Sequence, residues 1–188
     1  ARLIVIATEG TQTERRYFED LASSDFYRNP RVHVEVTKRE FNASSPEHII
    51  RELDKFKRTY SLGRYDELWL VIDVDRWTKE VISDIAARCY QKSYFLAVSN
   101  PCFELWLLLH VATISNYSPD KLKQLTENKK VGNRSRLEHE LISIVGNYNK
   151  SKYDTSAYIP NVASAIRQSQ TLDVNPDHRW PNQLGTRV

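Results

Sequence analysis

The distribution of apolar residues predicts alternating strands and helices in the first part of the chain. Three apolar runs have the length and composition of buried strands, at residues 2–8, 67–73 and 94–98. Residues 32–36 alternate between valine and polar side chains, which predicts a half-exposed strand at a sheet edge. The connections are long enough for right-handed crossovers, so the strands are expected to form a parallel sheet.

Helix signals lie between these strands, where apolar residues recur at intervals of three or four. Thr11 is the expected N-cap of the first helix, and Glu14 would complete a capping box with it. Pro46 and Thr78 mark the expected starts of the second and third helices, and Asn100 is the expected N-cap of the fourth. Repeated strand–helix units of this kind are typical of an α/β fold.

These elements also predict a strand order and a domain organisation. The half-exposed second strand belongs at an edge, so the order 2-1-3-4 fits best, with helices flanking a four-stranded parallel sheet in a Rossmann-like arrangement. After residue 115 the pattern changes to short helices. We therefore predict an α/β core over residues 1–115 and a helical appendage over residues 116–188, whose polar end from residue 175 is expected to be loose.

Carboxylate side chains follow two predicted strands that this order makes neighbours. Glu9 follows the first strand, and Asp73 and Asp75 follow the third. Ligands bind at the carboxyl edge of a parallel sheet, and hard oxygen ligands suit Mg²⁺ or Mn²⁺, so the sequence predicts a metal site there. Two simpler interpretations stay open: Glu9 complements the positive end of the following helix, and one of the aspartates is a surface or capping residue.

Two residues of the fourth helix also have more than one interpretation. Glu104 falls in the first turn of that helix, so it is a candidate fourth metal ligand, although a carboxylate is favourable at any helix N-terminus. His110 lies near the helix C-terminus, where a cationic histidine is stabilised, and we expect a structural role for it. The five histidines lack the spacing of a zinc site.

The composition narrows the class of protein. Of 188 residues, 40% are apolar and 27% charged, as in soluble globular proteins, and no apolar run reaches a membrane span of ~20 residues. Cys89 and Cys102 lack CxxC spacing, so no disulfide framework is indicated and a cytoplasmic location is expected. The sequence contains neither a P-loop motif nor a GxSxG motif, which argues against P-loop nucleotide chemistry and acyl transfer.

The net charge of +3 permits nucleic-acid binding without requiring it. Residues 120–136 are locally basic, and this segment is either a solvated surface or a phosphate-contacting patch. Its cations are Lys121, Lys123, Lys129, Lys130, Arg134 and Arg136. The alternative phosphate-contacting patch, nearer the carboxyl edge of the sheet, consists of Arg15, Arg16, Lys38 and Arg39.

The glutamate after the first strand and the DxD motif after the third resemble the Toprim domain, the metal-binding catalytic module of topoisomerases, primases and several nucleases. A closer resemblance is to the RloB family, whose signature blocks are similar to three segments of this chain in the same order. These segments are residues 6–18 (IATEGTQTERRYF), 71–75 (VIDVD) and 99–110 (SNPCFELWLLLH). The resemblance to Toprim covers roughly residues 2–110 and implies a Toprim-like core.

The resemblance also implies a function. RloB-family proteins occur in bacterial restriction-linked and abortive-infection loci beside an AAA/ABC-type ATPase, which implies phage defence with an ATPase partner. A chain of 188 residues leaves no room for the extra domains of topoisomerases and primases, so a nuclease remains. We expect hydrolysis of phosphodiester bonds in DNA or RNA with Mg²⁺ or Mn²⁺, Glu9, Asp73 and Asp75 being catalytic. The alternative is a catalytically silent Toprim-like module that binds nucleic acid or a nucleotide.

Overall fold

The computed structural model describes residues 2–37 and 45–188, so Lys38 and Arg39 of the alternative basic patch lie outside the described residues. The chain divides into two compact units. The first comprises Ala1–Ile72 and Trp77–Ala97, and the second comprises Asp73–Arg76 and Val98–Val188. Within the described residues, no helix has the length and apolar character that crossing a bilayer would require.

A mostly parallel sheet confirms the predicted fold class and strand order. Its five strands follow the order β2-β1-β3-β4-β7, the first four as expected from the sequence. The strands are β1 (Arg2–Thr8), β2 (Val32–Val36), β3 (Glu67–Asp73), β4 (Phe95–Asn100) and β7 (Gly185–Thr186). β1 pairs in parallel with β2 and with β3, and Thr8 lies opposite Val71. β1 and β3 therefore end at the same edge of the sheet.

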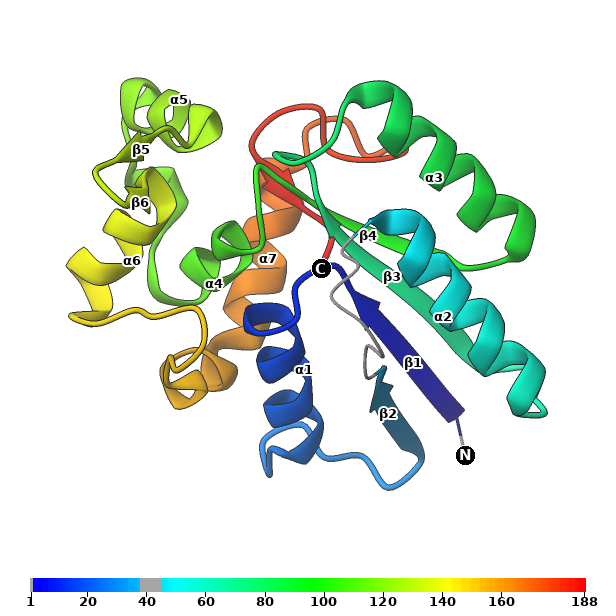
Figure 1. The fold of residues 1–188 in the computed structure, drawn as a ribbon. Coiled ribbons are helices and arrows are strands. Elements are labelled where there is room, and N and C mark those ends of the chain that lie inside the picture. The colour runs from blue at the N-terminus through cyan, green and yellow to red at the C-terminus, as the bar shows by residue number, and fades with distance from the viewer. Residues whose placement is uncertain (1, 38–44) are drawn as a thin grey trace. The chain divides into compact units, whose positions relative to one another are not determined.

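Three amphipathic helices cover the sheet in the first unit. They are α1 (Thr13–Ser23), α2 (Pro46–Thr59) and α3 (Lys79–Lys92). Figure 1 shows α2 and α3 side by side on one face of the sheet and α1 on the other. Their apolar stripes and the strands enclose a core in which Tyr17, Ile49 and Leu70 are fully buried. This core fixes the strands whose ends carry the candidate site.

The start of α1 differs from the prediction. Its N-cap is Gln12, which makes no side-chain capping bond, so the expected capping box of Thr11 and Glu14 is wrong. Because the helix begins at Thr13, Glu14 is its second residue and is not in the position from which a capping-box carboxylate reaches back. By contrast, α2 begins at Pro46 and Thr78 caps α3, both as predicted.

The second unit is built around an almost entirely apolar helix. All of α4 except its last residue is buried, and α6 and α7 pack against it. The elements of this unit after β4 are α4 (Glu104–Val111), η1 (Ile114–Asn116), α5 (Pro119–Glu127), β5 (Lys130–Val131), β6 (Arg134–Ser135), α6 (Arg136–Val145), η2 (Thr155–Ala157), η3 (Ile159–Asn161), α7 (Val162–Leu172) and β7. The expected cap of α4 is wrong: Asn100 ends β4, its amide donates to the Pro181 carbonyl at 3.1 Å, and Phe103 is the N-cap.

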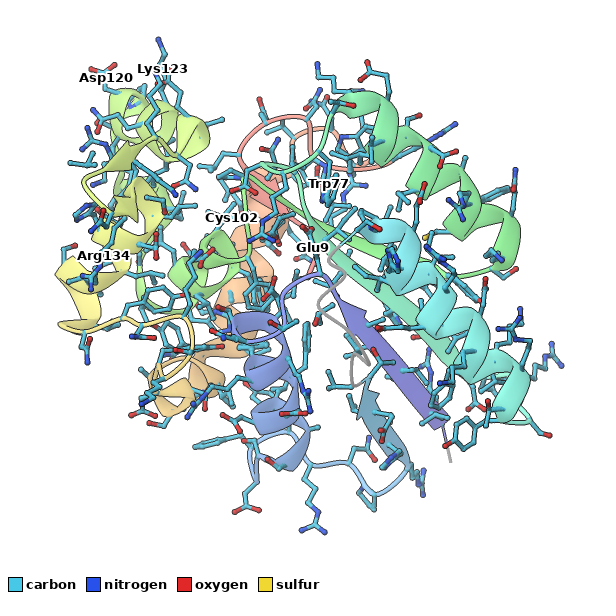
Figure 2. The ribbon with its side chains drawn as sticks, viewed as in Figure 1. Glu9, Trp77, Cys102, Asp120, Lys123 and Arg134 are labelled. Atoms are coloured by element: carbon cyan, nitrogen blue, oxygen red, sulfur yellow. The ribbon has the colours of Figure 1, made fainter. Side chains whose placement is uncertain are left out.

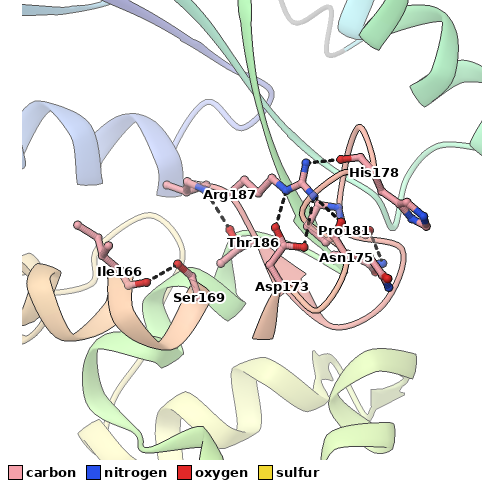
Figure 3. A network of polar contacts seen from close by, with 10 residues as sticks. Ile166, Ser169, Asp173, Asn175, His178, Pro181, Thr186 and Arg187 are labelled. Carbon is pink, nitrogen blue, oxygen red and sulfur yellow. Dashed lines mark hydrogen bonds and ion pairs between the residues drawn. The ribbon is translucent and has the colours of Figure 1, made fainter. Parts of the chain in front are cut away.

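The polar end of the chain is ordered, which corrects the prediction of a loose tail. β7 pairs antiparallel with the end of β4, and the hydroxyls of Ser99 and Thr186 are 2.8 Å apart. Arg187 closes the loop before this strand by donating to the Asp173 carboxylate at 2.8 Å and to the carbonyl of Asn175 at 3.1 Å (Figure 3). Strand pairing and the Arg187 guanidinium together therefore order a segment whose composition alone indicates a coil.

Candidate functional site

Glu9 occupies the turn directly after β1, in the first unit. Its backbone N–H donates to the Val71 carbonyl of β3 at 2.9 Å, so the turn follows the register of the two strands. The side chain is only 2% exposed, and the Trp77 indole N–H donates to its Oε1 at 3.1 Å. Figure 2 shows both side chains near the carboxyl ends of the strands. Trp77 thus orients a buried carboxylate.

A second buried acid lies at the same turn. A Cβ atom at Gly10 would overlap the Glu14 carboxylate, so a larger residue there would displace that carboxylate from its present position. Glu14 is 6% exposed, and the Thr8 hydroxyl tightens the turn by donating to the Gly10 carbonyl at 2.7 Å. The sequence pattern predicted a capping role for Glu14 and gave no indication that it is a buried acid of this turn. The glycine four residues before it was the available signal.

Asp73 and Asp75 belong to the second unit, where backbone hydrogen bonds fix the loop between them. The Pro101 carbonyl accepts from the N–H groups of Val74 and Asp75 at 3.1 and 3.0 Å, and the Ser99 carbonyl accepts from Val74 at 2.9 Å. Asp73 is buried at 9% exposure, whereas Asp75 is exposed. The residues that join β4 to α4 therefore hold both aspartates in place.

Glu104 is a buried member of an ion pair. It is 3% exposed, and its Oε1 accepts a hydrogen bond from the Tyr148 hydroxyl at 3.0 Å and lies 2.8 Å from Lys150 Nζ. Burial acts to raise the pKa of Glu104, but Lys150 outweighs it and the pKa lies below its usual value. Burial likewise acts to lower the pKa of Lys150, and Glu104 reverses the direction and raises it. Glu104 is thus ionised, and its negative charge is balanced by Lys150.

Three predicted acids share one electrostatic environment in the second unit. Burial raises the pKa of the Cys102 thiol, and the charges of Glu104, Asp73 and Asp75 raise it further. Although Asp75 as a whole residue is exposed, partial desolvation of its carboxyl group raises its pKa; Glu104 adds to this effect, while Arg76 and Lys150 oppose it. Cys102 therefore stays a neutral thiol, and negative charge accumulates around the DxD loop.

Three of the four predicted ligands lie in the second unit and one lies in the first. Asp73, Asp75 and Glu104 interact electrostatically within the second unit, whereas Glu9 belongs to the first. Among the described residues, no group of three or more His, Cys, Asp or Glu side chains is already arranged to hold a metal ion. The donor chemistry nevertheless fits a hard divalent cation, because each predicted ligand is a carboxylate.

Some of the predicted cations form ion pairs with carboxylates, and others are exposed. Lys121 pairs with Glu140, which also accepts from the Tyr117 hydroxyl at 2.6 Å, so Lys121 supports the packing of α5 on α6. Lys129 pairs with Glu127 at 3.0 Å and is 76% exposed. Lys123, Lys130, Arg134 and Arg136 are exposed. In the alternative patch, the described cations Arg15 and Arg16 pair along α1 with Glu19 and Asp20.

Comparison with known proteins gives one assignment. The profile of the family described as RloB-like protein matches residues 4–188, nearly the whole chain. Neither the curated proteins nor the solved structures contain a match.

Proposed function

The chain belongs to the RloB-like family, and we propose that it is a Mg²⁺- or Mn²⁺-dependent nuclease that hydrolyses phosphodiester bonds in DNA or RNA. The observation that carries the proposal is the position of two acids on neighbouring parallel strands. Glu9 directly follows β1, and Asp73 is the last residue of β3. Carboxylates at the carboxyl edge of such a sheet form the donor set that metal-assisted phosphoryl chemistry requires.

Each acid has a proposed role. Asp73 and Asp75 would hold one or two cations on the loop that Pro101 fixes. A bound cation would polarise a phosphoryl oxygen and lower the pKa of the attacking water. Glu9, oriented by Trp77, would complete the ligand set or transfer a proton to or from the water or the leaving group. Glu104, already paired with Lys150, would support the loop electrostatically and is the least suited of the four to bind a cation directly.

The biological setting is part of the same proposal. The resemblance to the RloB family supports a role in bacterial phage defence, with an AAA/ABC-type ATPase as the partner that regulates cleavage. Both cysteines are free and buried, which is compatible with the reducing cytoplasm. The nucleic acid would be held partly by the exposed cations that follow α5.

A binding module without catalytic activity is the second candidate. It is favoured by the neutralisation of Glu104 by Lys150, and by the fact that the described residues do not form a ready-made group of three metal ligands. Such a module would hold nucleic acid or a nucleotide in the presence or absence of a divalent cation. The two candidates therefore differ in whether a metal changes the covalent state of the substrate.

A cleavage assay separates the two. The purified protein is incubated with end-labelled single- and double-stranded DNA and RNA in Mn²⁺, in Mg²⁺ and in EDTA, with and without an AAA/ABC-type ATPase as the proposed partner. We expect shorter products with Mn²⁺ or Mg²⁺ and none in EDTA, because the carboxylates act through the cation. Binding of the substrates without cleavage under every condition would instead establish the binding module.

A further inference from the structure

Four cations of the second unit lie on a small antiparallel hairpin. β5 and β6 pair Lys130 with Ser135 and Val131 with Arg134, and Gly132 and Asn133 form the turn. We call residues 129–136 the basic hairpin. Gly132 has a φ of +65°, the left-handed region that favours glycine, and a Cβ built on it meets no atom within 4 Å. The tip of the basic hairpin therefore stands clear of the rest of its unit.

The base of the basic hairpin is held by side chains. Asn128 accepts a hydrogen bond from the Leu137 N–H at 3.0 Å, and its amide donates to the Cys102 sulfur at 3.4 Å. Ser135 and Glu138 form a reciprocal capping box at the start of α6. His139 Nε2 lies 3.0 Å from the Val131 carbonyl and fixes the first strand from the same helix. The hairpin is preorganised, so little conformational entropy would be lost when it binds a partner.

The charge of the basic hairpin is almost entirely of one sign. Residues 129–136 carry four cations and no carboxylate; of the two flanking acids, Glu127 pairs with Lys129 and Glu138 caps α6. Among the described residues, Lys130, Arg134 and Arg136 form no ion pair with a carboxylate. In Figure 2, Arg134 lies on the outer side of this part of the second unit, as does Lys123 of α5. A rigid, exposed cluster of this kind matches the charge of a phosphate backbone.

The shape and composition of this region favour a double helix over a single strand. Proteins that hold single strands stack the bases on exposed aromatic side chains. In residues 73–76 and 98–188, all of which the structure describes, the large apolar side chains that are strongly exposed are aliphatic: Val131, Ile144, Ile166 and Val174. A two-stranded ribbon fits the major groove of B-DNA, which is about 12 Å wide, whereas the major groove of A-form RNA is too narrow to admit it.

We propose that the basic hairpin enters the major groove of duplex DNA, with its cations on the flanking phosphates and Val131 at the base edges. The inference rests on the proposed function only in taking nucleic acid as the substrate. Val131 is 44% exposed in the strand opposite Arg134, where an aliphatic side chain would contact a thymine methyl group. The preferred substrate of the nuclease is then double-stranded DNA.

The test measures binding without cleavage. The full chain is titrated in EDTA against one labelled sequence prepared as duplex DNA, as single-stranded DNA and as duplex RNA, at several salt concentrations. Wild type should bind duplex DNA most tightly. The Lys130→Glu/Arg134→Glu variant should lose ~30-fold or more of that affinity and flatten the log–log salt dependence by a slope of about 2, since each lost phosphate contact contributes about 0.9. The control variant Lys152→Glu/Arg167→Glu makes an equal charge change at exposed sites elsewhere in the second unit. It should lose much less affinity for duplex DNA.

The outcomes separate this inference from the nuclease proposal. Tight binding of duplex DNA that depends on the hairpin, in a protein that never cleaves, would support the inference and refute the nuclease. Equal losses in the two double variants, equal affinity for all three nucleic acids, or no binding by wild type would overturn the inference even if cleavage is observed. Circular dichroism checks that both variants are folded, and Lys130→Gln/Arg134→Gln, which removes the same two phosphate contacts, should show about the same change in slope.

Discussion

Replacing both aspartates of the DxD loop, as Asp73→Asn/Asp75→Asn, should lower metal-dependent cleavage at least ~10³-fold, because the cation supplies several kcal/mol of transition-state stabilisation. Stability should change little. Asn keeps the shape of each side chain, and the raised pKa of Asp75 means that its ionised form is unfavourable in the folded protein. Cleavage rates and thermal midpoints of purified wild type and variant are the measurements.

The matched control for this prediction is Asp84→Asn, an exposed carboxylate on α3 whose side chain is 63% accessible. It should retain wild-type cleavage. If the double variant cleaves as fast as Asp84→Asn, the DxD loop does not hold the cation. If the double variant loses both cleavage and several degrees of thermal midpoint, its effect is structural and the assignment of the loop to catalysis is not supported.

Because of His110, the free energy of unfolding should fall markedly as the pH is lowered from 6.5 to 4. The ring is 4% exposed and Nδ1 lies 2.7 Å from the Trp106 carbonyl, and burial lowers the pKa of His110 from 6.5 to about 4. Below pH 6.5 His110 binds a proton in the unfolded chain, whereas in the folded protein it binds one only near pH 4. The contribution of this residue is therefore fully present above pH 6.5 and falls by roughly 3 kcal/mol as the pH drops to 4.

Urea unfolding at several pH values tests this sign and magnitude. In His110→Asn, which keeps a donor near the Trp106 carbonyl, the acid-dependent loss of unfolding free energy should be smaller than in wild type by that amount. His33→Asn, at an exposed histidine of β2, should keep the wild-type dependence. Identical pH profiles for wild type and His110→Asn would show that folding leaves the pKa of the ring unchanged, and a wild type made more stable by acid than His110→Asn would show that the folded protein holds the ring protonated, as its place near a helix C-terminus suggested from sequence.

The strand order was predictable from the sequence, whereas the environment of His110 was not. Apolar runs of strand length and one alternating run were enough to predict the sheet order, because burial on one or both faces of a strand is encoded in the residues of that strand. The environment of His110 depends on helices that follow α4 by tens of residues, so the helix sequence alone could not exclude a charged ring. Local caps were uncertain for a related reason: several polar residues near each helix start were equally suitable.

The positions of the acids in the fold were predictable from the sequence, but the residues that bond to them were not. The acids follow strands, so their place at the carboxyl edge follows from the apolar pattern. Trp77, which orients Glu9, is 68 residues away in the chain, and Lys150, which neutralises Glu104, is 46 residues from its partner. Such pairings are set by the packing of whole elements, and a single sequence has no local signal for them. The same holds for Arg187, which orders the end of the chain.

Direct measurement of Mn²⁺ binding tests whether Glu9, Asp73 and Asp75 form a metal site. Wild type, Glu9→Gln, Asp73→Asn/Asp75→Asn and Asp84→Asn are titrated with Mn²⁺ and the free ion is followed by electron paramagnetic resonance. We predict one or two bound ions in wild type and in Asp84→Asn, weakened binding in Glu9→Gln, and none in the double variant at the same concentrations. Equal binding by all four proteins, or by none, would contradict the account.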